Sequence, residues 1–179
     1  MSEKIKHVEI VFNAEWFQSG YFVYVLTIKH QTKGVYYYIG QTGDRNHEAA
    51  RSPFYRLMGH YSPYAGTDAQ LVRGLLKHEL VIEAEGKSNR VCLEEAFCDK
   101  TIEVKANYFN VLEFDSTDHV DKRKLVENVE QLVIANFEKE NKKLLNHKKE
   151  KKSKSITPSA AAQEVASTII NFFNANETL

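Results

Sequence analysis

The chain has 179 residues, of which 42% are hydrophobic and 27% charged, values that are ordinary for a folded globular protein. This length suits one domain with an appendage and is short for two full cores. Basic and acidic residues both number 24, and the resulting neutrality counts mildly against a nucleic-acid binder that depends on overall charge. No apolar run approaches the ~20 residues that span a bilayer, and residues 1–6 lack the apolar core of a signal peptide. We therefore expect a cytoplasmic protein with no membrane contact.

Two segments near the N-terminus predict a β-hairpin. Residues 21–29 and 35–39 are dense in aromatic and β-branched types, which suit a half-buried strand. The polar residues 30–34 lie between them, and Gly34 can take an unusual backbone angle in the turn. Residues 1–20 precede the hairpin and are predicted to form an N-terminal extension, either an extra strand or a covering arm.

Helical patterns follow. Ser52 and Pro53 predict the cap and first turn of a short helix that continues to residue 60. A second helix is predicted over residues 68–85, because its leucines recur at helical spacing. Residues 91–93 and 101–104 read as two short strands around a turn.

The second half of the chain ends in two further helices. A third main strand is predicted over residues 108–114, and the longest helical pattern covers residues 121–145. The lysine-rich segment 147–156 is predicted to be a linker; the surrounding run of lysines suits either contact with a DNA backbone or a solvated helix end. Thr157 and Pro158 predict the start of a closing amphipathic helix, within residues 157–179. These elements together predict an α+β fold, in which helices flank a small central antiparallel sheet of about three main strands.

Two short tyrosine motifs lie on the predicted hairpin, Phe22-Val23-Tyr24 and Tyr38-Ile39-Gly40. Downstream of them come Arg56, His60, Glu130 and Asn146. This order resembles the GIY-YIG nuclease family, although Phe22 stands where that family prefers glycine. The resemblance covers residues 21–146, which would form the nuclease domain, and implies a metal-dependent enzyme that hydrolyses DNA phosphodiester bonds.

The resemblance implies that tyrosines of both motifs line the site and that one of them activates water. A phenol with a pKa near ~10 is a poor base at neutral pH unless a cation or hydrogen bond lowers it. We assign the role of base to Tyr24 first and to Tyr38 second, with little to separate them. Gly40 is expected to let a phosphate or a backbone approach closely.

Arg56 is the predicted phosphate clamp, because a planar guanidinium suits this role and the residue lies in a helical stretch. His60 is four residues further on, so both side chains share one helix face, and it resembles a histidine that could shuttle a proton in some family members. Arg45 and Arg51 remain competitors for the role of Arg56.

The resemblance makes Glu130 the single metal ligand and Asn146 the late asparagine that closes the site. One carboxylate is chemically sufficient for Mg²⁺, which keeps most of its waters, and Mn²⁺ is the alternative cofactor. Glu127, one helical turn earlier, is the main competitor of Glu130. Asn146 also suits a helix C-cap.

The first functional hypothesis is therefore a DNA endonuclease of the restriction or repair type. A DNA site with two-fold symmetry would favour a homodimer, and the closing helix offers an apolar stripe for that contact. The second hypothesis is a protein that binds nucleic acid or acts as a scaffold with the same fold and no activity. The nuclease hypothesis predicts that Tyr24, Tyr38, Arg56 and Glu130 converge around one exposed concave surface.

Overall fold

The structure, a computed structural model, is an α+β domain built on one three-stranded antiparallel sheet. The strands are β1 (Gly20–His30), β2 (Gly34–Gln41) and β3 (Ile102–Glu113), in the spatial order β2-β1-β3. The predicted fold class is confirmed. The structure describes residues 11–44, 48–61, 70–114, 117–146 and 158–176.

The predicted hairpin is confirmed and sets the register of the sheet. β1 pairs with β2 along its length, and the turn between them includes Gly34 with a φ of 88°, which favours glycine. β1 also pairs with β3, with a bulge between Tyr21 and Phe22. Because β1 has a strand on each side and helices on each face, nearly all of its residues are buried.

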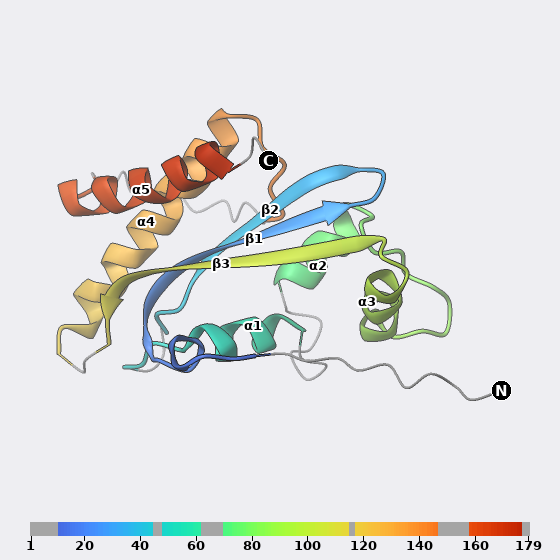
Figure 1. Ribbon diagram of the computed structural model, residues 1–179, viewed down its shortest axis with the longest axis horizontal. Helices are drawn as coiled ribbons and strands as arrows, with labels where there is room; N and C mark the ends of the chain where they lie inside the picture. The colour runs from blue at the N-terminus through green and yellow to red at the C-terminus, as the bar shows by residue number, and fades with distance from the viewer. Residues whose placement is uncertain (1–10, 45–47, 62–69, 115–116, 147–157, 177–179) are drawn as a thin grey trace.

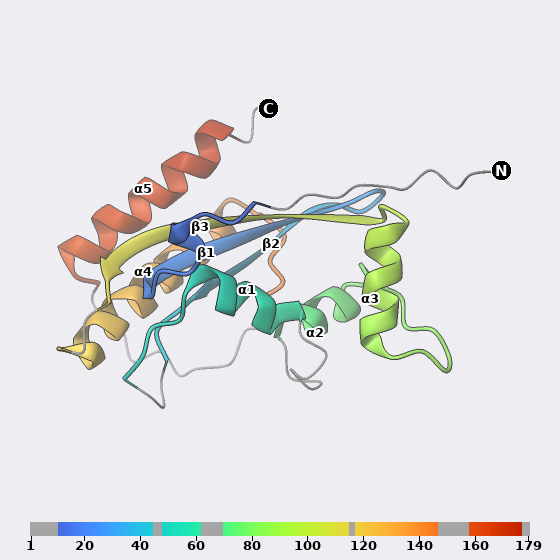
Figure 2. The same ribbon diagram turned by 60° about the horizontal axis from the view of Figure 1, so that its bottom comes forward.

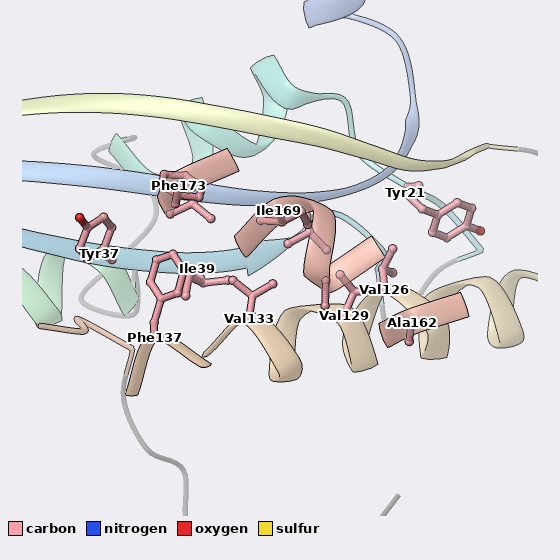
Figure 3. Close-up of a cluster of buried hydrophobic side chains, with 14 residues drawn as sticks. Tyr21, Tyr37, Ile39, Val126, Val129, Val133, Phe137, Ala162, Ile169 and Phe173 are labelled. Carbon is pink, nitrogen blue, oxygen red and sulfur yellow. The ribbon is translucent and has the colours of Figure 1, made fainter. Parts of the chain in front are cut away.

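One face of the sheet packs against α4 (His119–Lys139) and α5 (Ala160–Asn176), as Figures 1 and 2 show. Alternate residues of β1, namely Tyr21, Val23 and Val25, point into this layer. The helices contribute buried valines, aromatics and small residues, shown in Figure 3. We call this face the α4/α5 core.

The opposite face packs against α1 (Pro53–Tyr61), α2 (Gln70–Lys77) and α3 (Asn89–Cys98). The intervening β1 residues Tyr24, Leu26 and Ile28 point here, together with Tyr36 and Tyr38 of β2. We call this face the tyrosine face. None of the helices in the described ranges is long and apolar enough to cross a membrane.

Two helices end earlier than predicted, and each ends in the same kind of turn. After α2, the Leu80 N–H donates to Leu75 O and the Glu79 N–H to Leu76 O, both at 2.8 Å, with Glu79 left-handed at a φ of 52°. This is a Schellman ending, in which a glycine would be the usual residue. The expected helix over residues 68–85 therefore stops at Lys77, and residues 62–69 lie outside the described ranges.

The long helix α4 ends in the same way, at Lys139 and not at residue 145. Asn141 is left-handed with a φ of 58°, and the Lys142 N–H donates to Phe137 O at 2.9 Å. Asparagine tolerates this conformation better than most residues. The chain after Asn141 is thereby free to return to the sheet.

The strand predicted at residues 91–93 is wrong, since these residues belong to α3. The Ser88 hydroxyl accepts the Val91 N–H and caps this helix, and Cys92 and Leu93 are buried on its inner face. The strand signals at residues 101–104 and 108–114 belong instead to one continuous strand, β3. Cys92 and Cys98 are both free thiols.

The two terminal regions pack onto the domain. The described part of residues 1–20 contains η1 (Ala14–Trp16), and Phe12 and Phe17 lie against Phe54 of α1; residues 1–10 lie outside the described ranges. At the other end, Ser159 caps α5 by accepting the Ala162 N–H; the expected cap, Thr157, lies outside the described residues. The apolar stripe of α5 is buried against α4.

Candidate active site

Tyr24 occupies the centre of the candidate site and is completely buried on the tyrosine face. Its partner across the β1–β2 pair is Gly40. A Cβ atom on Gly40 would lie 2.2 Å from the Tyr24 hydroxyl oxygen and 2.4 Å from its Cζ. A side chain at this glycine of the second motif would therefore overlap the Tyr24 ring, and the expected close approach of a phosphate or a backbone to Gly40 stays a prediction.

Helix α1 brings Arg56 and His60 to the Tyr24 hydroxyl. Arg56 Nε donates to the Tyr24 oxygen at 3.0 Å, and His60 Nε2 lies 2.8 Å from the same oxygen. A guanidinium can only donate, whereas the phenol has one hydrogen to give. We therefore assign that hydrogen to the bond with His60 Nε2, which places the imidazole hydrogen on Nδ1. Capping by Ser52, whose hydroxyl accepts the Tyr55 N–H, fixes the start of this helix.

Burial dominates the acid–base properties of these groups. It raises the pKa of Tyr24 to about 12, although the Arg56 charge and hydrogen bond act in the opposite direction. Burial, with the nearby Arg56 charge, lowers the pKa of His60 to about 3. At neutral pH Tyr24 is therefore a phenol and His60 a neutral imidazole, which is ready to accept a hydrogen bond.

Tyr38 lies beside Tyr24, with ring centroids 6.4 Å apart, and its hydroxyl donates to Gln70 Oε1 at 3.3 Å. Burial, followed by the Tyr24 charge, raises the pKa of Tyr38. The Tyr24 hydroxyl contacts both Arg56 and His60, whereas the Tyr38 hydroxyl bonds to Gln70, so Tyr24 is the more central of the two candidate tyrosines.

The structure also separates the competing arginines. Arg51 is exposed and pairs with Asp44 at 2.9 Å, whereas Arg56 reaches Tyr24. Arg45 lies outside the described residues. The remaining tyrosines of β2 have packing roles: Tyr36 lies on the tyrosine face and Tyr37 in the α4/α5 core.

Glu130 comes from α4, on the other layer of the domain, yet its charge acts on the site. It raises the pKa of both Tyr24 and Tyr38, although burial is the larger cause for each. Its competitor Glu127 forms an ion pair with Arg123 at 3.6 Å. Of the two carboxylates, only that of Glu130 influences the tyrosines and Arg56.

A magnesium site with Glu130 as its ligand stays a prediction. The described residues contain no group of three or more His, Cys, Asp or Glu side chains that could hold a metal, so Glu130 would be a single protein ligand. Mg²⁺ is commonly bound by one or two carboxylates plus substrate oxygens, and the half-buried Glu130 offers that donor.

Asn146 closes the outer edge of β2 and is not a helix C-cap. Its Oδ1 accepts the Ile39 N–H at 2.9 Å, and its Nδ2 donates to Ile39 O at 2.7 Å. Just before it, the backbone of residues 143–145 pairs with Tyr37 on the same edge. Asn146 thus holds the backbone of the second motif in place and acts on the site through Ile39.

Sequence reasoning missed Tyr108, which stacks on Tyr24 with centroids 5.1 Å apart and planes at 28°. It lies opposite Tyr24 in the β1–β3 register, and Trp16 packs edge-on against the Tyr108 ring, with centroids 6.1 Å apart. No local pattern identifies this residue, because the register between distant strands is set by tertiary packing.

The expected exposed concave surface is wrong for the tyrosines. Tyr24, Tyr38 and His60 are at most 5% exposed, whereas Arg56 and Glu130 are half-buried. The structure brings Tyr24, Tyr38, Arg56 and His60 into contact, and Glu130 acts on them through its charge. No protein-family model, curated protein or solved structure matches this chain.

Proposed function

We propose that this protein is a metal-dependent phosphodiester hydrolase that acts as an endonuclease on DNA. The observation that carries the proposal is the hydrogen-bonded chain from Arg56 through Tyr24 to His60, with the Glu130 carboxylate acting on it. These groups come from three different elements. Together they supply a cation, a proton carrier, a proton acceptor and a carboxylate, which are the groups that hydrolysis of a phosphodiester requires.

Arg56 is the proposed clamp for the scissile phosphate. Its Nε is used by Tyr24, which leaves the N–H donors of its Nη atoms for phosphate oxygens. A phosphate there would offset the Arg56 charge that helps to depress the pKa of His60. Substrate binding would in this way make His60 a better proton acceptor.

Tyr24 is the proposed general base, acting with His60. The Tyr24 hydroxyl proton passes to His60 Nε2, and the resulting phenolate takes a proton from the attacking water. The hydroxide oxygen forms a bond to phosphorus while the bond to the leaving oxygen breaks; the leaving oxygen takes up a proton from solvent, and His60 releases its extra proton to solvent. In the free protein the two pKa values, about 12 and about 3, keep the proton on Tyr24, so the transfer depends on the arriving phosphate.

Glu130 is the proposed ligand of Mg²⁺, or alternatively Mn²⁺. The bound ion would serve as a Lewis acid that stabilises charge on the phosphate. Tyr38 packs beside the Tyr24 ring, and Asn146 positions the second motif through the Ile39 backbone.

One observation favours the second candidate, a nucleic-acid-binding or scaffold protein without activity. Tyr24, Tyr38 and His60 are almost fully buried, which suits a structural network as well as a catalytic one. Under this alternative the same hydrogen bonds stabilise the fold, and neither the wild type nor a Glu130 variant cleaves DNA.

Cleavage of supercoiled plasmid and of branched DNA, with Mg²⁺ or Mn²⁺, tests the proposal. Glu130→Gln keeps the size of the side chain and removes its charge, and Glu127→Gln is the matched control on the same helix. We expect metal-dependent nicking that falls at least ~10²-fold in the first variant and little in the second. Equal activity in both variants would refute the role of Glu130. A folded wild type that binds DNA without cutting any substrate would support the inactive alternative.

A further inference from the structure

Two tyrosine hydroxyls beside the candidate site have no hydrogen-bond partner among the described residues. They are those of Tyr61 and Tyr108, and both oxygen atoms are inaccessible to solvent. A buried hydroxyl without a partner destabilises the folded state, and most such groups in folded proteins are bonded to protein or to ordered water. These two hydroxyls therefore require an explanation.

Both rings pack onto the tyrosine face, next to the Arg56–Tyr24–His60 chain. Tyr108 stacks on the Tyr24 ring from the neighbouring strand β3. Tyr61 directly follows His60 at the end of α1 and packs edge-on against Phe97 of α3, with centroids 5.9 Å apart.

The Tyr61 hydroxyl also acts electrostatically on that of Tyr108. Burial raises the pKa of Tyr61. Burial also raises the pKa of Tyr108, and the neighbouring Tyr24 and Tyr61 hydroxyls raise it further. Tyr61 and Tyr108 therefore lie in one low-dielectric region behind Tyr24.

We propose that the Tyr61 and Tyr108 hydroxyls together hold one internal water molecule beside the Tyr24 ring. A hydroxyl can both donate and accept, so a single water between the two would satisfy both groups. The Tyr24 hydroxyl does not serve as their partner, because it bonds to Arg56 and His60 and neither Tyr61 nor Tyr108 is hydrogen-bonded to it. The ligand of this site is thus a neutral molecule that is both donor and acceptor, and the site is distinct from the place where a phosphate would bind.

The water would fix the Tyr108 ring, which in turn supports the ring of Tyr24. Tyr61 and Tyr108 are on this view positioning residues, and only this functional consequence rests on the proposed function. The binding site itself can be tested without any assay of DNA cleavage.

Thermal unfolding of Tyr61→Phe, Tyr108→Phe and the double variant tests the proposal. Each substitution removes one oxygen and keeps the ring, and Tyr55→Phe, on the exposed side of α1, is the matched control. We expect each single variant to lower Tm by roughly 2–4 °C and the control to leave it unchanged. Because loss of either hydroxyl disrupts the same water, the double variant should unfold at about the Tm of one single variant.

Three results would overturn the proposal: an unchanged or raised Tm in both single variants, a loss in only one of them, or losses that add in the double variant. A crystal structure of the wild type at high resolution provides a second, independent measurement. We expect solvent density within hydrogen-bonding distance of both hydroxyls. A dry contact there would refute the water site, whether or not the protein cuts DNA.

Discussion

Burial of a neutral His60 should make the stability of the protein depend on pH. In the unfolded chain this imidazole titrates near ~6.5, whereas its pKa in the folded protein is about 3. Between these values the unfolded chain binds a proton that the folded chain does not. The free energy of unfolding therefore rises with pH across this window, and the contribution is lost as the pH falls below 6.5.

The size of this change in the free energy of unfolding follows from the difference between the pKa values of His60 in the unfolded and the folded chain. Each pH unit within the window changes the free energy of unfolding by about 1.4 kcal/mol for a single proton. Because the unfolded imidazole is only half protonated at pH 6.5, lowering the pH from 6.5 to 4.5 should cost the wild type about 2 kcal/mol through His60 alone. His60→Gln cannot take up the proton and should lack this part of the pH dependence, whatever its stability at neutral pH.

Urea unfolding at a series of pH values between 4.5 and 7 measures the effect. The quantity to compare is the slope of the free energy of unfolding against pH, because the carboxylates and His30 contribute equally to wild type and variant. His78→Gln, at an exposed position after α2, controls for the loss of an imidazole. Equal slopes for the wild type and His60→Gln would refute the inference that His60 is buried in its neutral form.

Three further predictions concern the surroundings of Tyr24. Gly40→Ala should cost about 3 kcal/mol in urea unfolding, because the new methyl group would overlap the Tyr24 ring; a variant as stable as the wild type would contradict this packing. Asn146→Ala removes both side-chain hydrogen bonds to Ile39 and should lower the free energy of unfolding by about 1–2 kcal/mol in the same assay. An unchanged free energy of unfolding would show that Asn146 does not hold the edge of β2. Trp16 is the only tryptophan and packs on Tyr108, so Tyr108→Leu should shift its fluorescence emission to longer wavelength, whereas Tyr108→Phe should not. Identical emission spectra for the wild type and Tyr108→Leu would exclude the contact between Trp16 and Tyr108.

The parts of the fold encoded in local sequence were predicted correctly. The hairpin follows from two aromatic and β-branched runs with Gly34 between them, and the start of α1 follows from Ser52 and Pro53. The C-terminal ends of α2 and α4 were not predicted. Glu79 adopts the left-handed conformation of a helix end without being a glycine. Asn141 is a residue type that suits such an end, but apolar residues continue beyond it and favour a longer helix.

The candidate site was predicted as a set of residues but not as an arrangement. The order of the motifs identified Tyr24, Arg56 and Glu130, and only three-dimensional packing shows that their charges interact. The same holds for Tyr108, whose contact with Tyr24 depends on the pairing of strands far apart in the chain. Burial of the tyrosines depends on how helices cover the tyrosine face, which no short motif encodes.

The segment at residues 143–146 also has a consequence for assembly of the protein. The outer edge of β2 would otherwise present the free backbone groups of Tyr37 and Ile39, a template onto which a strand from another chain could add. The Leu145 N–H, the Lys143 carbonyl and the Asn146 side chain occupy those groups. A chain that ended before Lys143 would expose this edge, and we expect it to aggregate through intermolecular strand pairing. The residue that steadies the second motif thus also keeps the sheet from growing on that side.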